Sequence, residues 1–122
     1  RSAQSRKANL NGATFNWAKV TGAMLNEVTI VDVDMQGTIF ERANLTKVDF
    51  TSSNLLLANL NEAIMDGTQL SDVRVDKDWV EKLGKWKITN AQQLQAQYEV
   101  VPDTSGKYLA SKFLLKKVEK GE

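Results

Sequence analysis

The chain has 122 residues, enough to bury a core of its own, and its 42% hydrophobic and 25% charged residues are typical of an ordinary globular protein. The absence of cysteine and histidine excludes disulfide bonds, thiolate metal ligands and the imidazole used in much acid–base and zinc chemistry. The net charge is +1, with 7 basic against 9 acidic residues up to position 76 and 9 against 6 beyond it, so no strong field indicates a nucleic-acid partner.

Residues 1–7, RSAQSRK, are expected to form a polar N-terminal arm. None of them is large and apolar enough to cover Leu10 and Phe15, which open the hydrophobic pattern that follows. The sequence therefore predicts either that the start of this pattern docks on another molecule or that an upstream cover is missing.

A strict five-residue period runs from position 10 to position 75. Every position divisible by five in this range is apolar, and the residue two places before each is small or β-branched. The apolar positions are Leu10, Phe15, Val20, Leu25, Ile30, Met35, Phe40, Leu45, Phe50, Leu55, Leu60, Met65, Leu70 and Val75. Neither a helix nor a strand has this period, so the pattern indicates a solenoid of stacked short units.

Three segments carry a close family resemblance: ANLNG at 8–12, ANLTK at 43–47 and ANLNE at 58–62. They resemble the repeat A-[DN]-[LF]-x-x of the pentapeptide-repeat family. The resemblance implies an all-β solenoid over residues 8–76, a right-handed quadrilateral parallel β-helix with four pentads in each coil and about three and a half coils.

The corners of such coils fall two residues after each central apolar residue. This phase holds Gly12, Gly22, Gly37 and Gly67, but it also holds charged residues such as Arg42. We therefore expect a positive φ to be tolerated at the corners without being required.

Twenty residues per coil place Trp17 and Leu57 in one corner column with Gly37 between them. Leu56 adjoins Leu57, and Ile39 lies around the corner on the next face. Trp17, Ile39, Leu56 and Leu57 are therefore the candidate partner-binding residues, because an aromatic anchor on a rigid surface is a good docking site. The alternative is that Trp17 only lies flat over Gly37, since single exposed apolar residues are common.

Residues 77–122 are expected to form a small, mainly helical capping segment. Asp78 is a suitable N-cap for a short helix, and Gly84 is the expected stop. The structural cap is assigned to Trp79, Val80, Leu83 and Trp86. The tryptophans with their flanking lysines could also rest at a membrane surface, but packing on the last coil is the favoured interpretation.

A second helix is predicted through residues 89–98, with Thr89 or Asn90 as N-cap and Ala91, Leu94 and Tyr98 facing inward. A loop at residues 102–106 follows. Residues 107–118 are compatible with helix or strand, and an extended conformation is favoured.

No catalytic, cofactor-binding or metal-binding constellation is found in the sequence. Asp32 and Asp34 are close in sequence but occupy outward phases of different pentads. Walker, dinucleotide-binding and EF-hand patterns are absent. The chain is therefore not expected to be an enzyme or to use a cofactor.

The resemblance implies a protein-interaction scaffold, a small structural or accessory subunit of a larger complex, with a photosynthetic membrane complex as one candidate host. Its partners are expected to be other protein subunits, with no nucleic acid, no small-molecule substrate and only indirect membrane contact. The alternative is a DNA mimic that binds a topoisomerase such as gyrase, but the net charge of −2 over residues 1–76 is weakly acidic for that role.

The first residue is Arg1 rather than methionine, which suggests either that a targeting peptide was cleaved or that a longer protein was trimmed, with cleavage favoured. Some family members are processed into the thylakoid lumen. We therefore favour that compartment or the periplasm, and the cytoplasm stays open.

Overall fold

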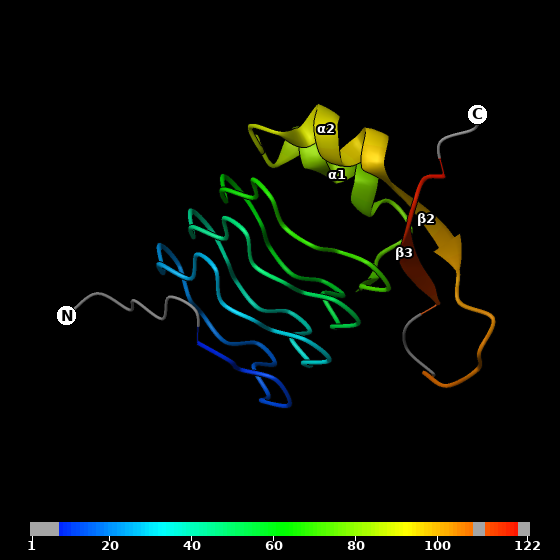
Figure 1. The fold of residues 1–122 in the computed structure, drawn as a ribbon, viewed down its shortest axis with the longest axis horizontal. Helices are drawn as coiled ribbons and strands as arrows, with labels where there is room; N and C mark the ends of the chain where they lie inside the picture. Colours follow the sequence, from blue (N-terminus) through cyan, green and yellow to red (C-terminus); the bar gives the residue numbers. More distant parts are fainter. Residues whose placement is uncertain (1–7, 109–111, 120–122) are drawn as a thin grey trace.

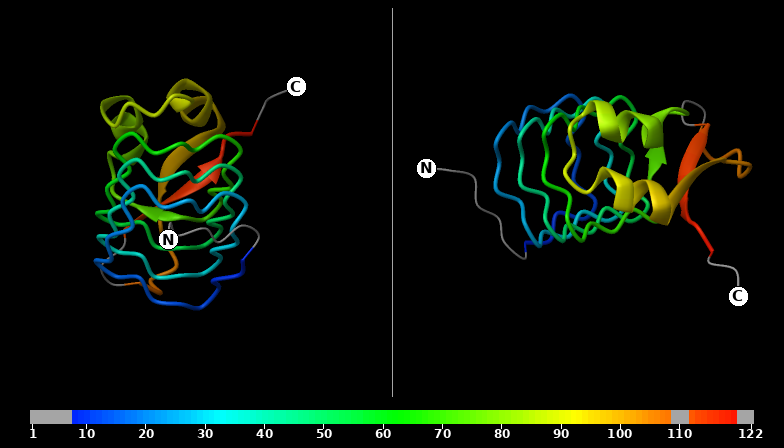
Figure 2. Two further views of the ribbon diagram at one scale, coloured as in Figure 1. Left: turned by 90° about the vertical axis from the view of Figure 1, so that its left-hand side faces the viewer. Right: turned by 90° about the horizontal axis from the view of Figure 1, so that it is seen from above.

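The computed structural model describes residues 8–108 and 112–119, so the predicted arm at 1–7 lies outside the described residues (Figure 1). The main body is a stack of coils, because each extended segment pairs in parallel with the segment twenty residues further along the chain. These bridges run from Asn9↔Thr29 to Asn54↔Arg74. The predicted offset of four pentads between stacked positions is therefore confirmed. In the left view of Figure 2 the coils overlie one another around a common four-sided outline.

Each pentad ends in a tight turn. The N–H of Ala13, for example, donates to the carbonyl of Leu10 across the corner residue Gly12 (3.1 Å). At every fifth position from Gly12 to Asp72 the corner residue has a φ between 58° and 77°, and only four of these residues are glycines. A positive φ at the third residue is characteristic of a type II turn. The expectation that the corners only tolerate a positive φ was therefore wrong, because the turn geometry imposes it on every side chain placed there.

The Asn or Asp that precedes each central residue stabilises the backbone of its own pentad. Oδ1 of Asn54 accepts the N–H of Leu56, two residues further on (2.9 Å). This local bond provides an acceptor for an N–H at the start of the turn. The same interaction is made by Asn9, Asp34, Asn44, Asp49 and Asn59.

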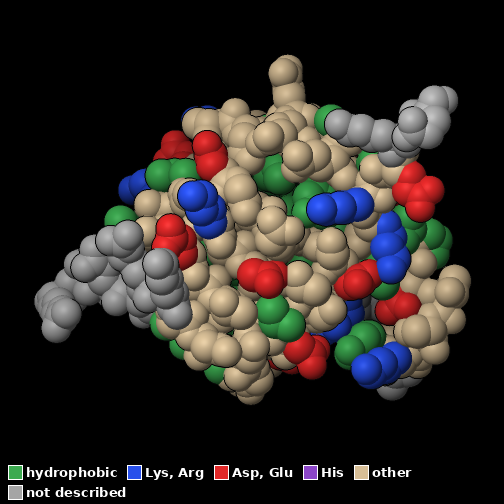
Figure 3. Space-filling view, in the orientation of Figure 1, with side chains coloured by type: hydrophobic (Ala, Val, Ile, Leu, Met, Phe, Trp, Pro, Cys, Tyr) green, Lys and Arg blue, Asp and Glu red, His purple; other side chains and the backbone are tan. Residues whose placement is uncertain are grey.

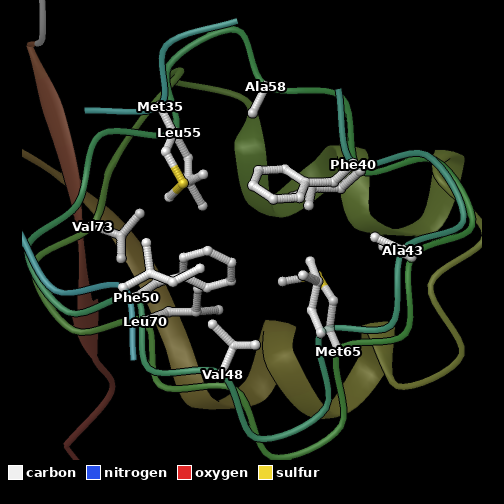
Figure 4. Packing of buried hydrophobic residues seen from close by; sticks show 14 of the residues in the cluster. Met35, Phe40, Ala43, Val48, Phe50, Leu55, Ala58, Met65, Leu70 and Val73 are labelled. Atoms are coloured by element: carbon white, nitrogen blue, oxygen red, sulfur yellow. The ribbon is translucent and has the colours of Figure 1, made fainter. Parts of the chain in front are cut away.

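The core fills the interior of the stack (Figure 4). Central residues such as Phe40 and Phe50 point inward and pack edge to face, with ring centroids 5.9 Å apart. Small residues such as Ala43 and Val48 fit beside them. Where the small residue is polar it is satisfied internally, as Ser53 Oγ shows by donating to the carbonyl of Ile30 (2.5 Å).

The C-terminal cap, defined here as residues 77–108 and 112–119, combines two helices with a strand pair. Helices α1 (Trp79–Lys85) and α2 (Ala91–Gln97) are followed by strands β2 (Tyr98–Pro102) and β3 (Phe113–Lys117). β3 lies between β2 and β1 (Arg74–Val75), the last piece of the stack, and both pairings are antiparallel (Figure 1). Of the tail predicted to be extended at 107–118, residues 113–117 form β3, while 109–111 lie outside the described residues. The prediction of a mainly helical cap omitted β2, whose partner is too distant in sequence to be recognised from local pattern.

The end of α1 differs from the prediction. Gly84 lies inside the helix, and Lys87 is the residue that adopts the left-handed conformation, with φ 58°. The N–H of Lys87 donates to the carbonyl of Gly84 (3.1 Å), and that of Ile88 donates to the carbonyl of Leu83 (3.3 Å). These two bonds define a Schellman motif, in which Leu83 and Ile88, both buried, are the usual hydrophobic pair.

The expected N-caps occupy their positions without capping. Asp78 makes no side-chain hydrogen bond to the helix backbone and instead forms an ion pair with Lys82 (3.4 Å). Asn90 also makes no capping bond, and its amide donates to the carbonyl of Met65 in the last coil (3.2 Å). The Asn90 side chain therefore attaches the cap to the stack, and Ala91, Leu94 and Tyr98 face inward as predicted.

Candidate interaction surface

The four residues singled out for partner binding lie around one corner of the stack, which we call the corner patch (Trp17, Ile39, Leu56 and Leu57). Among the described residues, Trp17 and Leu57 are the most exposed large hydrophobic side chains, at 64% and 54%. Ile39 and Leu56 are half-buried. Ile39 is bridged to Lys19 on the adjacent face, so the patch extends around the corner.

Backbone hydrogen bonds hold the column beneath the patch. The N–H of Trp17 donates to the carbonyl of Gln36 (2.8 Å), and that of Gly37 donates to the carbonyl of Leu56 (2.9 Å). At the last coil the N–H of Leu57 donates to the Oδ2 of Asp76 (3.1 Å). The corner is therefore a fixed platform, which reduces the entropy lost when a partner binds.

The Trp17 ring lies directly on Gly37. A Cβ added to Gly37 would stand 2.1 Å from Cε3 of Trp17, so no side chain fits beneath the ring. Gly37 is itself buried although it occupies a corner. The ring thus covers the glycine with one face and presents the other to solvent. Trp17 therefore lies flat over Gly37, as one interpretation of the sequence has it, and still leaves an aromatic face free for docking, as the other requires.

Two other exposed apolar side chains stand apart from the corner patch. Ile64, 43% exposed, is bridged to Asn44 on a different face. Val118, 39% exposed, borders a shallow groove of about 560 Å³ whose lining includes Val80, Val100 and Pro102. Sequence reasoning missed this groove, because its lining comes from both helices and both strands of the cap, and no local pattern joins them.

The predicted cap residues pack as a unit against the last coil. Trp79 and Leu83 are completely buried, while Val80 and Trp86 are partly buried against the same core. The Trp79 and Trp86 rings meet edge to face at 6.1 Å. Complete burial excludes Trp79 from contact with a membrane surface. Within the described residues, no helix is long and apolar enough to cross a bilayer.

The described residues contain no cluster of three or more metal-ligating side chains. Asp32 stands at an exposed corner, whereas Asp34 accepts a hydrogen bond from Asn54 Nδ2 (3.1 Å), so the two carboxylates are not paired. The backbone and hydroxyl groups of Ser105 lower the pKa of the partly exposed Asp103 carboxyl, with the backbone N–H as the main cause. Such a surface turn provides no base for catalysis.

Comparison with known proteins identifies the repeat. The model of the family described as pentapeptide repeats matches the chain in eight copies, over residues 8–46 and 38–75. No curated protein sequence matches significantly. A solved pentapeptide repeat protein from the Arabidopsis thaliana thylakoid lumen is similar at 16% identity and a TM-score of 0.42, with 70% of this chain and 77% of that one covered.

Two further solved structures are similar over smaller shares of their length. QnrB1, a plasmid-mediated fluoroquinolone resistance protein, is 23% identical with a TM-score of 0.38, and 68% of this chain and 47% of QnrB1 are covered. HetL, involved in heterocyst differentiation regulation in the cyanobacterium Nostoc, is 20% identical with a TM-score of 0.30, and the shares covered are 53% and 37%. This chain therefore spans less than half the length of either protein.

Proposed function

The chain belongs to the pentapeptide-repeat family, and from this premise we propose that it is a non-enzymatic interaction protein whose corner patch binds another protein subunit. The observation that carries the proposal is the Trp17 side chain, 64% exposed, held flat on Gly37 beside the exposed Leu57. The complementary surface is an apolar pocket on a folded protein, wide enough to take the free face of the indole ring.

The proposal rests on pre-organisation. Tryptophan is enriched among residues that dominate binding energies, particularly where a rigid surface presents it to a pocket. Here the ring is positioned by Gly37, and neighbouring coils hold the backbone beneath it. Little conformational entropy is lost on binding, so much of the apolar area buried on association contributes to affinity.

A role as a small accessory subunit follows from the same features. A short rigid stack without a catalytic constellation among its described residues is suited to holding other proteins in register. A photosynthetic membrane complex is one candidate host, and the thylakoid lumen or the periplasm remains the favoured compartment. Both assignments are predictions from the family resemblance.

Gyrase binding by DNA mimicry is the second candidate function. A DNA mimic needs a continuous acidic surface. Figure 3 shows basic and acidic side chains interspersed on one face of the molecule. Arg42 and Lys47 also occupy corners of the stack, where a continuous acidic surface would need negative side chains. These features favour a protein-docking role over mimicry.

The experiment that tests the proposal is affinity capture from native cell extract with wild type, Leu57→Arg and Ile64→Arg. Arg42 already occupies the corner phase of Leu57 with φ 58°, so Leu57→Arg is compatible with the backbone there. Ile64→Arg is the matched control, because it adds the same charge at another exposed apolar site.

We expect a specific partner, identified by mass spectrometry, to bind wild type and Ile64→Arg and to be lost with Leu57→Arg. Equal retention by all three proteins would exclude the corner patch as the docking surface. Inhibition of purified gyrase in a supercoiling assay, unaffected by Leu57→Arg, would favour mimicry instead.

A further inference from the structure

The two ends of the coil stack differ in how their backbone edges are covered. At the C-terminal end the cap supplies partners on every side of the last coil. The N–H of Glu62 donates to the carbonyl of Trp86 (2.6 Å), and the N–H of Leu70 donates to the hydroxyl of Tyr98 (3.1 Å). Further contacts include Asn90 Nδ2 to the carbonyl of Met65, the N–H of Asp72 to the carbonyl of Leu115, and the pairing of β3 with β1.

The first coil, residues 8–27, has no equivalent cover among the described residues. Within the stack, the N–H of Thr29 donates to the carbonyl of Ala8 and that of Ile39 donates to the carbonyl of Ala18. One coil earlier, the corresponding amides have no such acceptor in the described chain. They belong to Asn9, Thr14, Lys19 and Met24, one on each of the four faces.

An apolar opening lies inside this bare edge. Leu10, Phe15 and Val20 are only partly buried, whereas Ile30 and Met35, one coil further on, are 1% exposed. The first-coil residues line a hollow of about 40 Å³ that continues onto the second coil. An uncovered strand edge around an apolar centre is a template for association.

We propose that the open first coil is a docking surface for a second copy of this chain, with the two N-terminal coils meeting head to head. The occupant must supply backbone partners on four sides and apolar side chains in the middle, and the end of another β-helix does both. The cap already covers the C-terminal coil, so head-to-tail stacking is blocked. The matching open end on the described chain is the first coil itself.

Symmetry allows this contact to close. A two-fold axis perpendicular to the stack, through the faces of Asn9 and Lys19, places each of these two edge strands antiparallel to its own copy in the partner. The edge strand of Thr14 then lies antiparallel to the Met24 strand of the other copy, so all four edges can form well-aligned hydrogen bonds. Residues 8–27 carry one basic and one acidic side chain, Lys19 and Glu27, so no like-charge field opposes the approach. Leu10, Phe15 and Val20 of both copies then form one continuous core.

Sedimentation velocity of the full chain over a wide concentration range tests the proposal, with Ala18→Glu and Thr21→Glu as variants. Ala18 is half-buried at the opening, where two added carboxylates would face each other across the contact. Thr21 is exposed on the outer side of the same coil, so Thr21→Glu is the control for added charge. Circular dichroism confirms that each variant is folded.

We expect wild type and Thr21→Glu to dimerise and the dissociation constant of Ala18→Glu to rise at least about tenfold. Hydrogen exchange should show concentration-dependent protection of the Asn9, Thr14, Lys19 and Met24 amides. A monomer at every concentration would overturn the proposal. A dimer in which these four amides stay unprotected, or which Leu57→Arg abolishes and Ala18→Glu does not, would also overturn it by placing the contact elsewhere.

Discussion

Gly37→Ala tests whether Gly37 supports the Trp17 ring. Comparison with Gly22→Ala removes the backbone strain that alanine suffers at any corner with a positive φ. Gly37 has φ 71° and lies beneath the indole ring, whereas Gly22 has φ 70° with nothing within 4 Å of an added Cβ. Both alanines suffer the same backbone strain. Only the alanine at position 37 must also displace Trp17.

The expected magnitudes follow from these two environments. Placing alanine in the left-handed region costs about 1–2 kcal/mol of unfolding free energy at either position. At 64% exposure, about a third of the Trp17 surface is covered, roughly 90 Å² for a residue of this size. Exposing that area costs at most about 2 kcal/mol at ~25 cal/mol per Å². Gly37→Ala should therefore be less stable than Gly22→Ala by about 1–2 kcal/mol.

Urea unfolding followed by circular dichroism measures both values, and a double-mutant cycle with Trp17→Ala completes the test. In the Trp17→Ala background the excess cost of Gly37→Ala should vanish, because no ring is left to displace. Equal destabilisation by Gly37→Ala and Gly22→Ala in the wild-type background would refute the claim that Gly37 supports the indole ring. It would also weaken the corner patch as a rigid docking surface.

Three further outcomes are expected. Ser52→Gly should raise the unfolding free energy by about 0.5–1 kcal/mol in urea titration, because Ser52 occupies a corner with φ 64° that glycine adopts without strain. Asn54→Ala should lower it by about 1–2 kcal/mol in the same assay, since the N–H of Leu56 loses its acceptor. An NMR titration of Asp103 should give a pKa below 3.8, and Ser105→Pro should raise it by removing the donor N–H. Any stability that this carboxylate contributes is present above the unfolded pKa and is lost as the pH falls through the lowered folded pKa.

The corner patch was partly predictable, because in this repeat the separation of two residues in the sequence determines whether they stack in the same column. Once the period is known, residues twenty apart must stack, which places Trp17 and Leu57 on either side of Gly37. Spacing does not determine the solvent exposure of each side chain. The half-burial of Ile39 and Leu56 depends on the orientation of each side chain against its neighbours.

The cap shows where local pattern stops being informative. Apolar spacing identified α1 and α2, but β2 forms only because β3 returns to pair with it, with Val100 opposite Leu115. Gly84 was the expected helix stop on propensity, yet Lys87 adopts the left-handed conformation. Burial of Leu83 and Ile88 accompanies this choice, so packing outweighed the intrinsic preference of glycine.

The sequence by itself determined the solenoid, because a five-residue period can bury its apolar positions only when equivalent units stack on one another. It also determined that every corner needs a tight turn and that the interior alternates large and small side chains. Only the tertiary structure decided which backbone groups at the two ends of the stack are hydrogen-bonded. The cap covers the backbone edge of the last coil, whereas the edge amides of the first coil have no acceptor among the described residues. The physical reason is that hydrogen bonds at an edge join residues distant in the chain, so their partners appear only once the chain has folded.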